Sequence, residues 1–189
     1  KISVRAHVVS IGGIKAQVDY SNLREDLYET PLYCTDEEAT QKMIQLIDRV
    51  REEGDSLGGV VEVVVDNLPP GLGSHVHWDR KLDGRLAGAL MSIQGFKGVE
   101  IGLGFAGAEL RGSAVHDPIS YKQGRGFYHY SNKAGGLEGG MSNGERIIIR
   151  GAMKPIPTLS KPLESVDFFT KEKYLASVER SDVCAVPAA

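Results

Sequence analysis

A loop dense in glycine, at residues 131–144 (SNKAGGLEGGMSNG), is the segment most typical of a ligand-binding backbone. Five of its fourteen residues are glycine. Glycine lets the backbone approach a ligand closely, and successive N–H groups can then point at an anion. The loop matches neither the Walker A pattern nor the dinucleotide fingerprint, since no strand leads into it and no Gly-Lys-Ser/Thr closes it. A ligand-binding loop and a mobile surface loop both remain open as interpretations.

Residues 154–158 (KPIPT) form a stiff, polar segment behind a strand-like run. Pro155 and Pro157 fix φ at their positions, so the segment is expected to be extended. Such a backbone can hold the Lys154 ammonium and the Thr158 hydroxyl at a set distance, as a phosphate or polar ligand tail requires. An ordinary exit from an edge strand is the alternative interpretation.

Arg180 and Asp182 place a cation and a carboxylate two residues apart, after another strand-like run. If the strand continues, both side chains point to the same side. Their pairing would keep the Asp182 carboxylate ionised and hence able to accept a proton. A surface ion pair is the alternative interpretation.

The histidines give little support for a metal site. His75 and His77, near Asp79, have a spacing that allows shared ligation on an extended segment, but no third ligand is evident nearby. The sequence therefore predicts no metal ion. The other conspicuous side chains are expected to be structural, with a packing role for Trp78 and surface positions for His116, Asp117 and His129.

Composition excludes several classes of protein. The 189 residues are 41% hydrophobic and 25% charged, the balance of a soluble domain that can bury a core. A formal net charge of −3 argues against a nucleic-acid partner. No apolar run approaches the roughly 18–20 residues of a membrane span, which argues against a membrane partner. Cys34 and Cys184 suit a reducing compartment, although they could pair. We expect a cytoplasmic protein in which residues 1–189 are one domain or a large piece of one.

The best-supported helix spans residues 36–53. Thr35 lies three residues before Glu38, which is the spacing of a capping box. Apolar side chains follow at helical spacing, and Gly54 supplies a C-terminal stop. A second helix is expected over residues 80–93. Because little of its second half is polar, this helix is expected to be buried between layers.

Strands are expected on either side of these helices. The segments rich in β-branched or alternating residues are 2–11, 59–66, 97–104 and 145–150, followed by paired strands at 164–169 and 174–179. Since each helix falls between strands, the sequence predicts a mixed α/β protein with helices packed on sheets.

The chain closely resembles the chorismate synthase family in an ordered series of segments: DNLPPGLGS, KLDGRLAGALMSIQGFKGVEIGLGF, RGS, HDPI, SNKAGGLEGGMSNGE, KPIPTL, PLESVD and ERSDVCAVPAA. The resemblance covers nearly the whole chain. Any one of these motifs is unspecific, but their number, order and spacing make the match specific.

The resemblance implies a β-α-β sandwich, in which helices lie between antiparallel sheets. It also implies a lyase of the shikimate pathway, which makes chorismate for aromatic amino-acid biosynthesis. The reaction is a 1,4-anti elimination of phosphate from 5-enolpyruvylshikimate 3-phosphate. It requires reduced FMN although it is redox-neutral overall, and either NADPH or an outside donor reduces the flavin. Members of the family are homotetramers.

The same resemblance implies individual site residues. Its FMN contacts correspond to Gln94 and Gly95, to Gly139, to Lys154, Pro155, Ile156, Pro157 and Thr158, and to Arg180. Asp182 corresponds to the candidate for proton transfer at the flavin or at C6 of the substrate. These assignments favour the ligand-binding interpretation of residues 131–144 and 154–158.

Family motifs that would precede this region are absent from the sequence. They are an opening Gly-Glu-Ser-His-Gly, the arginines that follow it, and a Ser-Ser-Ala-Arg type motif with a nearby histidine. These motifs would supply the catalytic histidines and much of the positive charge for an anionic substrate. At the other end, Pro187 lies near the start of a helix that has no body. We therefore expect a truncated chain that is inactive alone. The alternatives are a non-catalytic domain that binds FMN or phosphate, and an assembly element.

Overall fold

The computed structural model describes residues 1–23, 27–179 and 182–189. They form two compact units. Unit 1 comprises Lys1–Ala6 and Glu62–Ala152, and unit 2 comprises His7–Val61 and Met153–Ala189. Arg180, one of the predicted cofactor contacts, lies outside the described residues.

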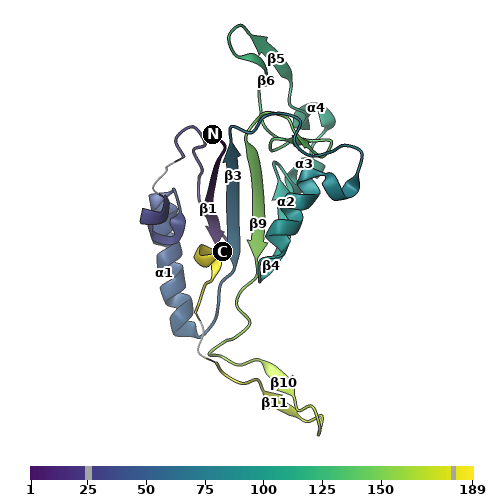
Figure 1. The fold of residues 1–189 in the computed structure, drawn as a ribbon. Coiled ribbons are helices and arrows are strands. Elements are labelled where there is room, and N and C mark those ends of the chain that lie inside the picture. The colour runs from purple at the N-terminus through teal and green to yellow at the C-terminus, as the bar shows by residue number, and fades with distance from the viewer. Residues whose placement is uncertain (24–26, 180–181) are drawn as a thin grey trace. The chain divides into compact units, whose positions relative to one another are not determined.

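The main sheet has five strands in the order β2-β1-β3-β9-β4 (Figure 1). Their bounds are Ser3–Ile11 (β1), Ile14–Lys15 (β2), Gly59–Asp66 (β3), Phe96–Ile101 (β4) and Ile147–Met153 (β9). β1 and β2 form an antiparallel hairpin in which Ser10 lies opposite Lys15. β1, β3, β4 and β9 confirm the strands expected at residues 2–11, 59–66, 97–104 and 145–150. The mixed α/β class with antiparallel pairing is also confirmed.

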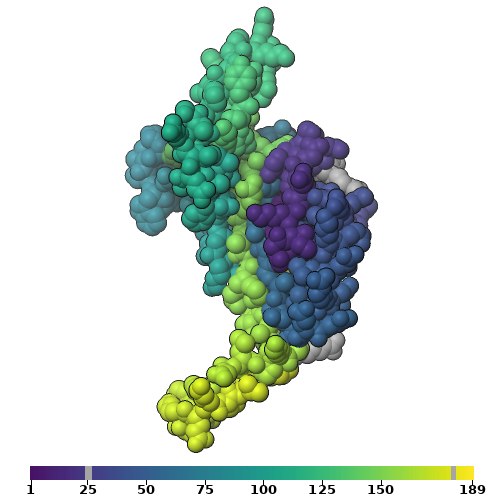
Figure 2. Space-filling view, turned by 180° about the vertical axis from the view of Figure 1, so that it is seen from behind, coloured from purple at the N-terminus to yellow at the C-terminus, as the bar shows by residue number. Residues whose placement is uncertain are grey.

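Three smaller antiparallel hairpins lie outside this sheet. They are formed by Ile119–Lys122 (β5) with Gly126–His129 (β6), Leu137–Glu138 (β7) with Met141–Ser142 (β8), and Glu164–Val166 (β10) with Lys173–Leu175 (β11). The last pair confirms the predicted pairing, with Ser165 opposite Tyr174, although its strands are shorter than expected. The β5–β6 hairpin was not predicted. Figure 2 shows it standing clear of the rest of unit 1, and the ring of Phe127 is 80% exposed.

The helices are Glu37–Glu53 (α1), Leu82–Met91 (α2), Phe105–Ala108 (α3) and Gly112–Val115 (α4). Single 3-10 turns occur at Leu27–Glu29, Pro31–Tyr33, Trp78–Arg80 and Val186–Ala188. Within the described ranges, none of the helices has both the length and the apolar character that a bilayer crossing requires.

Helix α1 begins at a different cap from the one predicted. Asp36, rather than Thr35, is the N-cap, and its carboxylate accepts the backbone N–H of Ala39 at 3.0 Å and that of Gln17 at 2.9 Å. The helix ends as expected at Gly54, which adopts the left-handed conformation with φ 73°. Asp36 thus fixes both the start of α1 and the segment that follows β2.

Replacing Asp36 by alanine is expected to lower the free energy of unfolding by about 1 kcal/mol, the usual value of an N-cap. The N–H groups of Ala39 and Gln17 hold the pKa of the Asp36 carboxyl below its usual value. Its contribution is therefore complete above the unfolded-state pKa and lost as the pH falls through the folded-state pKa. Urea denaturation at pH 7 and pH 3 should show a larger difference at pH 7 than at pH 3. Asp48→Ala, in the same helix but in a surface pair with Arg51, is the control.

Helix α2 packs one face on the core of unit 1. The buried residues of this core are Val65, Leu137, Ile147 and Ile149, and Leu82, Leu86 and Leu90 of α2 pack against them. These three leucines form an apolar stripe along the helix. The prediction that the helix is buried between layers is wrong for the described residues, because no residue of α2 is buried. Its other faces carry apolar side chains that are largely exposed, such as Met91 at 47%.

Two sets of ion pairs, one centred on Glu62 and the other on Asp66, connect parts of unit 1. The Glu62 side chain is fully buried, and the guanidinium of Arg150 donates to it at 2.7 Å and to the carbonyl of Gly102 at 2.9 Å. Asp66 accepts from Arg5 and, at 2.6 Å, from Arg146. Although burial acts in the opposite direction, these two arginines hold the pKa of the Asp66 carboxyl below its usual range. Charge pairing thus joins strands β1, β3 and β9 within this unit.

Candidate functional site

The segment Lys154–Thr158 follows β9 without regular secondary structure, in unit 2. Lys154 is exposed, and its ammonium donates a hydrogen bond to the adjacent carbonyl of Pro155 at 3.3 Å. The carbonyl of Ile156 accepts a hydrogen bond from the buried hydroxyl of Ser56 at 2.6 Å. The segment therefore presents a cation to solvent while its middle is fixed to another part of the chain.

Asp182 lies in the same unit with an exposed side chain. The carbonyl of the next residue, Val183, accepts the N–H of Leu57 at 2.8 Å, and Cys184 forms a parallel bridge with Leu57. The predicted pairing of Asp182 with Arg180 falls on a residue that is not described and stays a prediction. The Asp182 side chain is thus exposed, and the backbone of the following residue is held by the hydrogen bond from Leu57.

Gln94 and Gly95 lie in unit 1, in the turn between α2 and β4. The side chain of Gln94 is exposed, and Gly95 has φ 85°, a left-handed conformation that favours glycine. β4 runs antiparallel to β9, because Gly102 donates to Ile148 at 3.0 Å while a Cβ on Gly151 would lie 2.1 Å from the Phe96 ring. Gln94 and Gly95 therefore lie at the end of the sheet where β9 finishes.

Gly139 lies at the opposite end of α2. It is in the turn of the β7–β8 hairpin, and the carbonyl of the next residue, Gly140, accepts the N–H of Leu82 at the start of the helix. Gln94 follows the other end of this ten-residue helix, which is about 15 Å long. Within unit 1, the structure does not bring Gly139 and Gln94 together.

The glycine-rich loop is ordered by hydrogen bonds, which does not fit a mobile surface loop. The Asp117 carboxylate accepts the N–H groups of Lys133 and Ala134, each at 2.9 Å, and the hydroxyl of Ser131. Although burial opposes the shift, these hydrogen bonds lower the pKa of Asp117 below its usual value. Sequence reasoning placed Asp117 on the surface, because its partners lie fourteen or more residues away in the chain.

Two further placements differ from expectation. The side chain of His129 is only 10% exposed and lies between Glu138, at 3.5 Å, and Glu145, at 3.7 Å, so it is not a surface residue. Trp78 is 85% exposed and does not pack as predicted, because no described element covers it. Both cysteines are free. No group of three potential metal ligands occurs within residues 1–23, 27–179 and 182–189.

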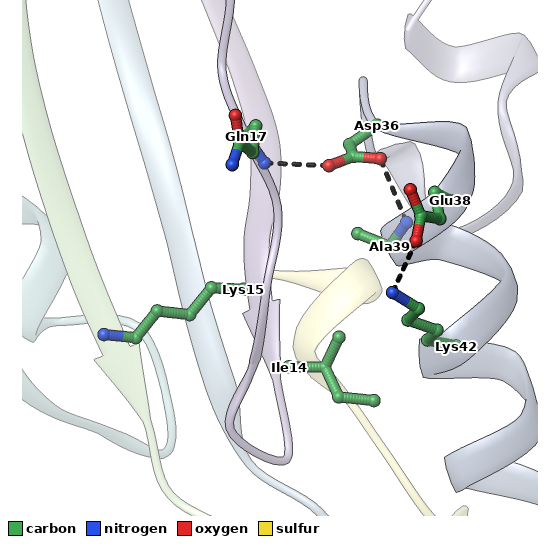
Figure 3. Close-up of a pocket in the computed structure, with 7 residues that line it drawn as sticks. All are labelled: Ile14, Lys15, Gln17, Asp36, Glu38, Ala39 and Lys42. Atoms are coloured by element: carbon green, nitrogen blue, oxygen red, sulfur yellow. Dashed lines mark hydrogen bonds and ion pairs between the residues drawn. The ribbon is translucent and has the colours of Figure 1, made fainter.

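A polar depression in unit 2 contains none of the predicted site residues (Figure 3). Its charged groups largely satisfy one another, since Asp36 accepts two backbone N–H groups and Lys42 pairs with Glu38 at 2.6 Å. Lys15 points away from both carboxylates. The arrangement of these side chains therefore gives no support for a ligand-binding site in this depression.

Comparisons with known proteins give one family. A family model described as chorismate synthase matches residues 1–189. The chain is 62% identical to the chorismate synthase of Desulforamulus reducens and 58% identical to that of Moorella thermoacetica. The alignments cover 100% of this chain and 50% and 49% of those proteins. A crystal structure of chorismate synthase matches 82% of this chain, and 50% of that chain, with 47% identity and a TM-score of 0.76. The chain spans about half the length of the relatives it matches, and it belongs to the chorismate synthase family.

Proposed function

We propose that this chain contributes to a reduced-FMN-dependent lyase that eliminates phosphate from 5-enolpyruvylshikimate 3-phosphate to give chorismate. The observation that carries the proposal is the match to the family over residues 1–189, at 62% identity to one chorismate synthase. The protein is proposed to act in the cytoplasm as a homotetramer, with NADPH or another donor as the source of reducing equivalents.

The residues present fit a phosphate-bearing flavin. Lys154 offers an exposed ammonium, and the backbone that follows it, up to Thr158, has no regular secondary structure. Gln94, Gly95 and Gly139 belong to unit 1, and residues 154–158 belong to unit 2. That all of them contact FMN is proposed from the family match over residues 1–189.

When bound, reduced FMN supplies electron density to the substrate as phosphate leaves and regains it as the C6 hydrogen is lost. The role proposed for Lys154 is to bind the anionic cofactor by a charge-assisted hydrogen bond. The role proposed for Asp182, which is exposed, is to accept or hold a proton at C6 or at the flavin.

The chain alone is proposed to be inactive. Its net charge of −3 provides little attraction for a substrate with a phosphate and two carboxylates. An anaerobic assay of chorismate formation with reduced FMN, run on this chain and on the full-length protein, tests the proposal. Activity only in the full-length protein supports it. Absence of activity in a folded, flavin-bound full-length protein would overturn the assigned reaction.

A second candidate, an assembly element, has one observation in its favour. The β5–β6 hairpin exposes several aromatic or aliphatic side chains, among them Tyr121 at 61% and Phe127 at 80%. Apolar groups this open are typical of surfaces that meet a partner. Light scattering with flavin titration separates the two candidates, because an assembly element would associate without binding FMN.

Replacing Lys154 by alanine in the full-length protein is expected to weaken FMN binding by roughly 10- to 100-fold, since a hydrogen bond to a charged group contributes about 1.5–3 kcal/mol. Quenching of FMN fluorescence measures the affinity. Lys161→Ala removes an equal charge from an exposed position seven residues further on, and it should leave the affinity unchanged. Equal affinities for the two variants would remove Lys154 from the cofactor site.

A further inference from the structure

The linker between α1 and β3, residues Asp55–Gly58, contacts both predicted site segments of unit 2. Ser56 donates its hydroxyl to the carbonyl of Ile156, in the middle of residues 154–158. Leu57 donates its backbone N–H to Val183, the residue after Asp182. One short segment thus contacts the backbone near Lys154, the proposed FMN-binding lysine, and the backbone next to Asp182, the proposed proton acceptor.

The Ser56 hydroxyl is placed for this single contact. Ser56 is 8% exposed, its Oγ lies 2.6 Å from the Ile156 oxygen, and its own N–H donates to the Asp55 carboxylate at 2.7 Å. Ile156 lies between two prolines, which have no N–H to form a ladder with a neighbouring strand. A buried side-chain hydrogen bond therefore substitutes for the backbone pairing that this segment lacks.

Gly58 brings the linker directly against the start of the same segment. A Cβ at this position would lie 2.4 Å from the carbonyl oxygen of Met153 and 2.9 Å from the nitrogen of Pro155. Both are backbone atoms, so a side chain here would have to displace the chain just before and after Lys154. Glycine at residue 58 thus sets where the lysine leaves β9.

We propose that Ser56 and Gly58 are positioning residues of the flavin site, which hold residues 153–158 in the conformation that binds the cofactor. The inference rests on the proposed function and extends it to two residues that do not themselves contact the cofactor. Without the Ser56 hydroxyl, the Ile156 carbonyl loses its partner and the segment must be ordered by the ligand, which weakens binding. Ser56 therefore acts on affinity through the backbone on either side of Ile156.

The test measures the Kd for oxidised FMN in the full-length protein, by fluorescence quenching, beside the free energy of unfolding without flavin. Ser56→Ala is expected to raise the Kd about fivefold, the value of one hydrogen bond. Ser56→Thr, which keeps the hydroxyl, is expected to restore it. Gly58→Ala is a second variant, and its methyl group should raise the Kd at least as much.

Thr40→Val is the matched control. Thr40 is 4% exposed, and its hydroxyl also donates to a backbone carbonyl, that of Asp36 at 2.7 Å, in the same unit. It should reduce stability about as much as Ser56→Ala and leave the Kd unchanged. If Ser56→Ala and Thr40→Val change the Kd equally, or if Ser56→Ala and Gly58→Ala leave it unchanged, the positioning role is overturned.

The result also separates this inference from the proposed function. A wild-type protein that binds no FMN would contradict the proposed cofactor. A wild-type protein that binds FMN, with variants that bind it equally well, would contradict only the positioning role.

Discussion

Replacing Asp182 by alanine in the full-length protein is expected to lower turnover by about 10²- to 10⁴-fold, the usual contribution of a positioned general acid or base. FMN binding should be retained, because Lys154 and the backbone beside it are the groups proposed to hold the flavin. The measurement is the anaerobic rate of chorismate formation at saturating reduced FMN, with the Kd for FMN determined in parallel.

Glu179→Ala is the control for Asp182→Ala, since it removes an exposed carboxylate three residues earlier and makes the same change in net charge. It should leave turnover near that of the wild type. Turnover of Asp182→Ala close to that of the control would show that Asp182 transfers no proton in the rate-determining steps. A loss of flavin affinity together with turnover would instead make it a binding residue.

Replacing Arg150 by alanine is expected to destabilise the protein by about 3–5 kcal/mol, because it leaves a buried carboxylate without its guanidinium partner. Glu62 is fully buried, and Arg150 lies 2.7 Å from it and also donates to the Gly102 carbonyl. Urea denaturation measures the change. Arg51→Ala, which removes an exposed pair with Asp48 at 2.8 Å, should change the free energy of unfolding by less than about 1 kcal/mol.

The double replacement Glu62→Leu with Arg150→Leu tests the cause. Because both charges are then removed together, most of the stability lost in Arg150→Ala should return. If the double variant is as unstable as Arg150→Ala, the loss arises from the packing of the arginine stem and not from the uncompensated charge.

Local patterns in the sequence were sufficient for the strands and for α1. The valine-rich β3 and the periodic apolar residues of α1 lie where they were expected, and Gly54 ends the helix. The N-cap was assigned one residue early, because Thr35 and Asp36 are both good caps, and the hydrogen bonds that Asp36 accepts from Ala39 and Gln17 could not be read from the sequence. The burial of α2 was not predictable. Its apolar sequence indicates that the helix can pack against other elements, but it does not indicate which elements cover each of its faces.

The candidate site was predictable only in part, because its order depends on distant contacts. Residues 131–144 were recognised as a loop, but its order comes from Asp117, which no local pattern connects to it. Likewise, KPIPT indicates a stiff backbone, whereas its attachment to Ser56 spans 100 residues of sequence. The placement of Arg180 is not described, so its part in the site stays a prediction.

The separation between Ser56 and Ile156 has a consequence for the protein during its synthesis. A ribosome that adds about 5–20 residues per second needs roughly 5–20 s to make the 100 residues between the two partners. Through that interval the α1–β3 linker has emerged without the segment that it will hold, and the second partner, Val183, is made later still. The proposed cofactor site of this region can therefore form only after nearly all of these 189 residues have been translated.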